Sequence, residues 1–227
     1  MKIDAVMFDL DGLLADTEDF HVIAYDAVAK SLGIKLPRDY IISFIGAPTV
    51  VNLKRLMRDF GIPESRFEEL LKVRYDRYSE IIRTIPLAPM DGALECIVTM
   101  RNRGFKTALV TSSLREHSIG VLENISRHSS PGVDIKNLFD IMVFGDEIKE
   151  LKPAPDIYLE AVKRLKTRPE RCIALEDSEA GVASAKAAGL IVIAVPCSHT
   201  KEQKFDRADF VVSSLNEVLK LSLLCGS

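Results

Sequence analysis

The sequence has 227 residues, of which 47% are apolar and 28% are charged, and its formal net charge is −3. These values are typical of a soluble globular protein with one large domain or two modest ones. Lysine and arginine are scattered along the chain, which argues against a nucleic-acid partner. No apolar run reaches the roughly 18 residues of a membrane-spanning helix, and none forms a signal core. We therefore expect a cytoplasmic protein with no membrane partner.

The four cysteines, Cys96, Cys172, Cys197 and Cys225, lie far apart without C-x-x-C spacing. Isolated cysteines in an intracellular protein are reduced as a rule, so we expect neither disulfides nor a zinc site.

Short apolar runs recur along the chain and predict buried strands of a parallel sheet. They lie at 3–9, 105–111, 139–144, 171–177, 190–195 and 208–212. Helical periodicity appears between most of them, at 92–104, 155–166 and 178–189. In the last of these, Ser178 is placed as an N-cap and Gly189 as a C-terminal stop. The alternation predicts an α/β protein with a Rossmann-like open parallel sheet, helices on both faces and a site at the carboxyl ends of the strands.

One long segment departs from this alternation. From about residue 17 to 84 only helical periodicity appears, and almost seventy residues are too many for a loop inside a compact domain. We predict an α-helical bundle, a cap domain of residues 17–85, inserted into a core domain of residues 1–16 and 86–227. Residues 125–137 read as a surface loop, and Asp91 as a surface turn residue; neither receives a chemical role.

The stretch VMFDLDGLLADTE, residues 6–18, ends the first strand with acidic residues. Side chains two apart on a strand share a face, so Asp9 and Asp11 emerge near each other, and Gly12 permits a sharp turn. On its own this pattern also fits turn formers, helix caps or a calcium loop.

Polar groups also stand at or near the ends of other predicted strands. Thr111, Ser112 and Ser113 stand where the second strand ends and a helix begins, Lys152 lies in LKPAPDIY, and Glu176 and Asp177 end the fourth strand. Each is weak evidence alone, because capping residues and solvated charges are common. Together they place four carboxylates, one ammonium and several hydroxyls at one edge of the sheet. Mg²⁺ would relieve the repulsion among those carboxylates.

The motifs DLDGLLADTE, VTSS, KPAPDIY and LEDSEAG, in this order, resemble those of the haloacid dehalogenase superfamily of phosphohydrolases. With the inserted helices, the chain is similar to the β-phosphoglucomutase-like and CbbY-like subgroup. The resemblance implies that Asp9 is the nucleophile that forms an aspartyl-phosphate, and that Asp11 is the general acid and base. Asp11 also favours phosphate esters over carbon–halogen or phosphonate bonds, because relatives that cleave those bonds lack this acid.

The resemblance assigns the remaining groups of the site as well. Asp9 and Asp177 would bind Mg²⁺ through their carboxylates and Asp11 through its backbone carbonyl, with Glu176 as a further ligand or just behind them. A second set would bind phosphate: the hydroxyl of Thr111 and the N–H of Ser112 would hold phosphoryl oxygens, and Lys152 would offset negative charge.

In the helical insert, the resemblance indicates substrate contacts at Thr17, His21, Gly46 and Thr49. His21 matches a position that contacts substrate or the acid/base in related mutases, although an exposed polar residue on a helix is an alternative.

The mutases grip a second phosphate with an arginine at the position of Thr49 and a lysine near Glu80. This chain has no basic residue at either place. Arg74 or Arg77 could substitute, but both are expected to be solvated.

These observations predict a Mg²⁺-dependent phosphatase for a small phosphorylated metabolite, such as a sugar phosphate or nucleotide-like monophosphate. The nearest alternative is a β-phosphoglucomutase-like hexose-phosphate mutase. A receiver-like signalling module is disfavoured, because such modules have no helical insert and carry their aspartate on a later strand. The sequence neither ranks individual substrates nor decides the oligomeric state.

Overall fold

The computed structural model describes residues 2–44, 47–129 and 132–224. Its centre is a six-stranded sheet in which every neighbouring pair is parallel. The strands are β1 Ala5–Phe8, β2 Lys106–Thr111, β3 Ile141–Phe144, β4 Cys172–Glu176, β5 Ile191–Ala194 and β6 Phe210–Val211. Their order is β3-β2-β1-β4-β5-β6, so the six predicted strands and the predicted sheet type are confirmed.

Nine α-helices surround this sheet in the described residues. They are α1 Glu18–Ser31, α2 Arg38–Ile42, α3 Thr49–Asp59, α4 Phe67–Thr84, α5 Ala93–Asn102, α6 Arg115–Ser129, α7 Asp156–Leu165, α8 Glu179–Ala187 and α9 Leu215–Val218. Short 3₁₀ helices lie at Glu64–Arg66, Ile135–Leu138, Gly145–Glu147, Pro169–Arg171 and Ser222–Leu224. The Ser178 hydroxyl caps α8 by accepting from the N–H of Gly181, as predicted.

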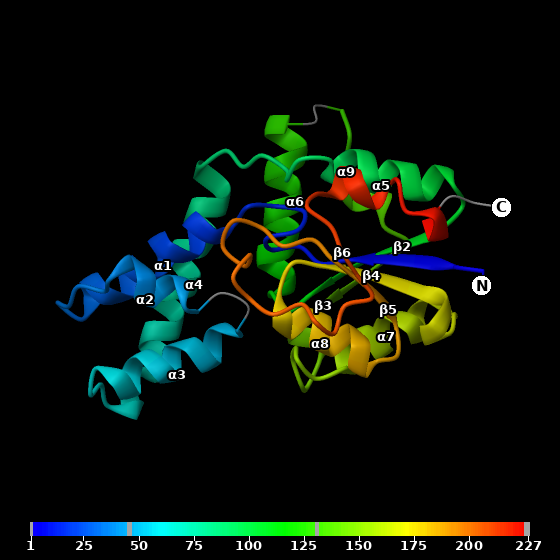
Figure 1. Cartoon of the computed structure of the whole chain (residues 1–227). Coiled ribbons are helices and arrows are strands. Elements are labelled where there is room, and N and C mark those ends of the chain that lie inside the picture. Colours follow the sequence, from blue (N-terminus) through cyan, green and yellow to red (C-terminus); the bar gives the residue numbers. More distant parts are fainter. Residues whose placement is uncertain (1, 45–46, 130–131, 225–227) are drawn as a thin grey trace.

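The sheet separates two layers of helices, with α5, α6 and α9 on one face and α7 and α8 on the other (Figure 1). Successive side chains of β1 point to opposite faces of the sheet, so they pack against different helix layers. Val6 and Phe8 pack with the first layer, whereas Ala5 and Met7 pack with the second. All four are fully buried, as expected for a strand in the middle of a parallel sheet.

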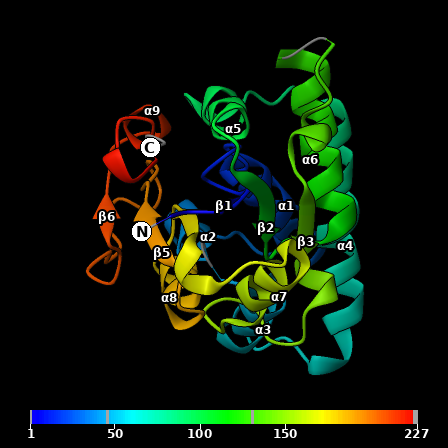
Figure 2. The same ribbon diagram turned by 90° about the vertical axis from the view of Figure 1, so that its right-hand side faces the viewer.

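Helices α1 to α4 lie together beyond the carboxyl ends of the strands (Figure 1). We call them the helical layer. Helix α4 also runs alongside α6 of the core (Figure 2), where Tyr78, Ile81 and Ile82 join the large apolar cluster of the sheet. The C-terminal half of α4 therefore attaches the helical layer to the core.

The prediction of a surface loop over 125–137 is wrong at both ends. Residues 125–129 are the last part of α6, and Ile135–Leu138 forms a 3₁₀ helix. Ile125 and Ile135 are buried, so apolar packing continues regular structure into a stretch whose polar composition suggested a loop. Asp91 is an exposed turn residue, as expected, and accepts a hydrogen bond from Asn216.

Cys96, Cys172 and Cys197 are free thiols, as expected, and the fourth cysteine, Cys225, lies outside the described residues. Within the described ranges, no helix combines the length and the apolar character needed to cross a membrane.

Candidate active site

Three adjacent strands bring polar groups to one edge of the sheet. Strands β2, β1 and β4 are neighbours and parallel, so their carboxyl ends meet. Asp9 follows β1, Thr111 ends β2, and Asp177 follows β4. They line a cavity of about 230 Å³ together with residues of the helical layer. We call its core side the strand-end wall, made of Asp9, Asp11, Thr111, Lys152 and Asp177.

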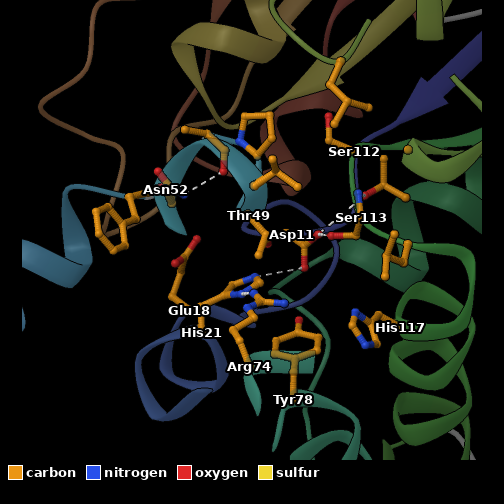
Figure 3. Close-up of a pocket in the computed structure, with 18 of the residues that line it drawn as sticks. Asp11, Glu18, His21, Thr49, Asn52, Arg74, Tyr78, Ser112, Ser113 and His117 are labelled. Atoms are coloured by element: carbon orange, nitrogen blue, oxygen red, sulfur yellow. Dashed lines mark hydrogen bonds and ion pairs between the residues drawn. The ribbon is translucent and has the colours of Figure 1, made fainter. Parts of the chain in front are cut away.

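The opposite side of the cavity belongs to helices α1, α3 and α4 (Figure 3). We call it the helical wall, made of Glu18, His21, Tyr25, Thr49 and Arg74. Thr49, predicted as a substrate contact, is the first residue of α3 and lines the cavity. Gly46, predicted beside it, lies outside the described residues.

Three buried carboxylates form a group that could hold a metal ion. Asp9, Glu176 and Asp177 each offer an oxygen within 4.8 Å of the other two. Burial, followed by the charges of Asp9 and Glu176, raises the pKa of Asp177 well above its usual value. Burial also raises the pKa of Asp9 to about 8, although Lys152 opposes the shift. Such a donor set fits a divalent cation, because oxygen ligands suit it and its charge favours the ionised carboxylates.

Gly12 allows this group to be compact. Its backbone has φ +83°, and a Cβ atom at this position would overlap the carboxylate of Asp177. Any other residue would therefore be strained and would displace a candidate metal ligand.

Lys152 is the positive charge inside the strand-end wall. Its Nζ lies 2.6 Å from Asp9 Oδ1 and 2.6 Å from Glu176 Oε1, and it donates to the carbonyl of Val110 at 3.0 Å. Glu176 Oε1 also accepts a hydrogen bond from the Tyr158 hydroxyl at 2.5 Å. Lys152 thus holds the oxygen of Asp9 in place and leaves Glu176 with two donors on one oxygen.

Asp11 has a different environment from Asp9. The hydroxyls of Thr17 and Ser113 each donate to its carboxylate at 2.6 Å. Burial alone would raise its pKa, but His21 and these two hydroxyls outweigh burial and lower it well below the usual range. The side chain of Asp11 does not belong to the three-carboxylate group found in the described chain.

Thr17 shows how the sequence provides this environment. It stands at the N-cap position of α1, where threonine often caps the helix, but its side chain makes no capping bond. The hydroxyl donates a hydrogen bond to Asp11 instead, and this bond connects the start of the helical layer to the strand-end wall.

His21 lies between Asp11 and Arg74. Its Nε2 is 3.9 Å from Asp11 Oδ1, and its Nδ1 is 2.5 Å from Nη2 of Arg74 (Figure 3). Because a guanidinium can only donate, Nδ1 must accept, and the ring proton is on Nε2, facing Asp11. Burial and the charge of Arg74 lower the pKa of His21, which agrees with a neutral ring. The two hydroxyl donors support an ionised Asp11 whatever the charge of His21.

The turn after β2 supplies hydroxyl and backbone groups. Thr111 is buried, and its Oγ1 accepts from the N–H of Ser113 at 3.0 Å. Ser112 lines the cavity, and its Oγ is buried without a partner among the described residues. These atoms lie beside the carboxylates, at the place where the sequence predicted phosphate binding.

The structure brings together all the predicted site residues that it describes; Gly46 lies outside the described residues. Those that line the cavity are Asp9, Asp11, His21, Thr49, Thr111, Ser112, Lys152 and Asp177, with Thr17 and Glu176 bonded to members of this set. His21 is therefore no exposed helix residue. Arg77 pairs with Glu80 on the surface, as predicted, at 2.7 Å.

The sequence prediction gave no definite role to three residues of the site. Ser113 and Tyr158 lie inside the motifs VTSS and KPAPDIY, but the motifs did not indicate their hydrogen bonds to Asp11 and Glu176. Arg74 was expected to be solvated but is buried at 2% exposure. Arg74 lies against the ring of Tyr25 in α1. The sequence alone does not show that α1 is the helix that covers it.

Comparison with known proteins agrees with this geometry. The family model described as haloacid dehalogenase-like hydrolase matches residues 6–195. CbbY from Rhodobacter capsulatus is 32% identical over 221 residues, covering 95% of each chain. The phosphorylated carbohydrates phosphatase of Thermotoga maritima is 35% identical over 191 residues, covering 83% of this chain and 82% of the relative.

A solved structure resembles the whole chain. CbbY from Rhodobacter sphaeroides in complex with phosphate has a TM-score of 0.81 and 28% identity, covering 95% of this chain and 96% of that one. The fold, the ordered motifs and these relatives lead to one conclusion: the chain belongs to the haloacid dehalogenase-like hydrolases.

Proposed function

We propose that the protein is a Mg²⁺-dependent phosphatase that hydrolyses a small phosphorylated metabolite through an aspartyl-phosphate on Asp9. The observation that carries the proposal is the contrast between two aspartates two residues apart. Asp9 is held by Lys152 within a group of carboxylates, whereas Asp11 is held by hydroxyls outside that group. One carboxylate can then attack while the other transfers protons.

Asp9, Asp177 and Glu176 would hold Mg²⁺, with the carbonyl of Asp11. When bound, the ion would offset charge on phosphoryl oxygens and on the carboxylates. Lys152 fixes the Asp9 oxygen that forms the bond to phosphorus, while the bond from phosphorus to the ester oxygen breaks. Thr111, near the same edge, would hold the transferring phosphoryl group.

Asp11 would protonate the leaving oxygen and then accept a proton from the attacking water. In the free protein its lowered pKa keeps it ionised, which suits the second role. A phosphate dianion bound nearby opposes that ionisation, so substrate binding would raise the pKa and supply the proton needed first. The water oxygen finally bonds to phosphorus, and the bond between phosphorus and Asp9 breaks.

The helical layer would act as a cap, with residues 17–85 as a unit distinct from the core of residues 1–16 and 86–227. It closes one side of the cavity and would exclude water during phosphoryl transfer. Two relatives support a carbohydrate-like substrate: the Thermotoga maritima enzyme is named for phosphorylated carbohydrates, and CbbY of Rhodobacter sphaeroides was solved with xylulose-1,5-bisphosphate.

The test is release of inorganic phosphate from p-nitrophenyl phosphate and from a panel of sugar phosphates. Wild-type protein should lose activity in EDTA and regain it with Mg²⁺. Asp9→Asn should lower the rate by about 10³-fold or more, since it removes the nucleophile. Asp16→Asn is the matched control, because Asp16 is exposed in the same loop. Phosphate release that continues in Asp9→Asn or in EDTA would refute the proposal.

The same panel separates hydrolysis from sugar-phosphate interconversion. Basic residues are missing at Thr49 and Glu80, but the buried Arg74 lies in the same cavity, so the missing residues do not by themselves exclude a mutase. Free phosphate as the product, without an isomeric sugar phosphate, would exclude the mutase.

A further inference from the structure

Two buried polar residues of the loop after β5 lie beside the candidate metal ligands. Cys197 and Thr200 are both buried, and neither takes part in the phosphatase mechanism proposed above. The sulfur Sγ of Cys197 lies 3.6 Å from Oδ2 of Asp177. We call Cys197 and Thr200 the thiol–hydroxyl pair. The loop thus adds two polar side chains to the carboxyl end of β4.

The thiol–hydroxyl pair is held in a tight turn by its own hydrogen bonds. The N–H of Cys197 donates to Oγ1 of Thr200 at 3.0 Å, and the hydroxyl of Thr200 donates to Sγ at 3.4 Å. The carbonyl of Cys197 accepts from the N–H groups of Thr200 and Lys201, at 3.2 and 3.0 Å. The sulfur already accepts one hydrogen bond, so its own hydrogen is left for another acceptor. Oδ2 of Asp177 is that acceptor, because an ionised carboxylate can only accept.

The two oxygens of Asp177 have different surroundings. Oδ2 lies near both Sγ of Cys197 and the backbone of Gly12, where a Cβ atom would overlap it. In the described part of the chain no hydrogen bond or ion pair reaches Oδ1, although Asp177 is only 3% exposed and lines the cavity. An unsatisfied oxygen on a buried carboxylate is costly unless a ligand supplies the partner. Asp9 and Glu176 each offer an oxygen within 4.8 Å, so a divalent cation is the ligand that fits.

We propose that Cys197 is a positioning residue for the cation site: its thiol holds Oδ2 of Asp177 and so leaves Oδ1 directed at Mg²⁺. This inference rests on the Mg²⁺ site of the proposed function and adds to it a residue outside the four sequence motifs. A thiol is a weak donor. It therefore orients the carboxylate without competing strongly with the cation for its negative charge. Loss of such an outer partner commonly lowers metal affinity by about 10- to 100-fold.

Cys197 could instead contribute only packing to the loop. In that case its replacement would lower the stability of the fold, as for any buried thiol, but the affinity for Mg²⁺ would not change. Positioning predicts a loss of Mg²⁺ affinity that another hydrogen-bond donor restores. Cys172 is the matched comparison, since it is also buried and its Sγ donates to the carbonyl of Arg168 at 3.2 Å. It begins β4, whereas Asp177 follows the end of that strand.

The experiment measures the dissociation constant of Mg²⁺ by isothermal titration calorimetry on metal-free protein, without any phosphate ester. Cys197→Ala should weaken Mg²⁺ binding by about tenfold or more. Cys197→Ser should recover most of the affinity, because a hydroxyl also donates. Thr200→Val keeps the shape of the side chain but removes the anchor of the sulfur, and should weaken binding by a smaller factor. Cys172→Ala is the control and should bind Mg²⁺ as wild type does.

Urea unfolding in EDTA separates packing from positioning. Both alanine variants should lose stability, whereas only Cys197→Ala should lose Mg²⁺ affinity. The inference is overturned if Cys197→Ala binds Mg²⁺ as tightly as wild type, if serine recovers none of the lost affinity, or if wild type binds no Mg²⁺. Should Cys197→Ala not fold, Thr200→Val decides the question, because it leaves the thiol in place, and an unchanged affinity in that variant overturns the inference.

These affinities do not depend on turnover. If p-nitrophenyl phosphate and the sugar phosphates release no phosphate, the proposed function fails, and weaker Mg²⁺ binding by Cys197→Ala still supports the positioning role. An active phosphatase that is sensitive to EDTA, but whose Mg²⁺ affinity is the same with and without the thiol, overturns the inference alone.

Discussion

The two walls of the cavity differ in how their charged groups are partnered. On the strand-end wall, Lys152 contacts two carboxylates, and Asp11 receives two hydroxyl hydrogen bonds. On the helical wall, Arg74 forms no ion pair with a carboxylate of the described residues, and the hydroxyl of Tyr25 has no hydrogen-bond partner among them. The charged groups of one wall are partnered within the chain, whereas the other wall keeps buried polar atoms that no described residue satisfies.

This difference assigns separate tasks to the two walls. A wall whose groups are already oriented by one another needs no reorganisation when phosphate arrives, and preorganised charge is the largest contributor to many enzymatic rates. A wall with unsatisfied donors gains most from a ligand that supplies acceptors. Under the proposed function, the chemistry would therefore belong to the strand ends, and the helical layer would influence the choice of substrate.

The largest expected effect comes from removing the shared cation of the strand-end wall. Lys152→Met leaves the buried carboxylates of Asp9 and Glu176 facing each other without a counter-charge. Breaking a buried ion pair by removing one partner costs about 3–5 kcal/mol. We expect a loss of unfolding free energy of this size, measured by urea denaturation in EDTA, together with loss of phosphatase activity.

Lys149→Met is the matched control, because Lys149 is exposed in the same segment of the chain. It should change the unfolding free energy by less than about 0.5 kcal/mol. Equal effects of the two substitutions would mean that the strand-end wall does not depend on its internal ion pairs, and the contrast between the walls would disappear.

Two tyrosines test the same contrast with hydroxyl groups. The Tyr158 hydroxyl donates to Glu176 at 2.5 Å, whereas the buried Tyr25 hydroxyl has no partner. Tyr158→Phe should cost about 1.5–3 kcal/mol, since it removes a hydrogen bond to a charged group. Tyr25→Phe should be neutral or slightly stabilising, because no hydrogen bond is lost. Thermal or urea unfolding of the ligand-free variants measures both, and a similar cost for each would contradict the contrast.

The same contrast explains how far the sequence could predict the molecule. The strands, the sheet type and most of the strand-end residues were predicted, because three of the four motifs stand at the end of an apolar run, which fixes their position. Ser178 and Gly12 show how local backbone requirements are visible in the sequence. The helical wall was harder, because Arg74 is buried only by the packing of α4 against α1. A helical pattern shows which face is apolar but not which helix covers it.

The prediction of a surface loop over residues 125–137 was wrong for a related reason. Ile125 and Ile135 are isolated apolar residues in a polar stretch, and only the core they enter makes that stretch regular. Local composition therefore misjudges segments that are anchored by one or two side chains.

The smallest predicted effect concerns what the strand-end wall still lacks. Three carboxylates, Asp9, Glu176 and Asp177, surround one lysine, so a further positive charge is needed. Without metal, burial raises the pKa of Asp177 well above its usual value, so the folded state favours the protonated carboxyl more than the unfolded state does. The unfolded state then binds fewer protons, so stability falls as pH rises above the unfolded pKa and toward the folded one.

The raised pKa values of Asp9 and Glu18, both about 8, also fall near the interval from pH 7 to pH 8, so the difference between wild type and Asp177→Asn, and not the wild-type slope alone, measures the contribution of Asp177. Burial lowers the pKa of His21 and lowers that of His117 to about 4, so both rings are neutral throughout. In EDTA, Asp177→Asn should lose about 1 kcal/mol less unfolding free energy over this interval than wild type, close to the linkage of one proton. Saturating Mg²⁺ should abolish the difference in slope by ionising Asp177 in the folded wild type. Parallel stability curves in EDTA would show that Asp177 is already ionised without a metal, and that the strand-end wall needs no cation from outside the chain.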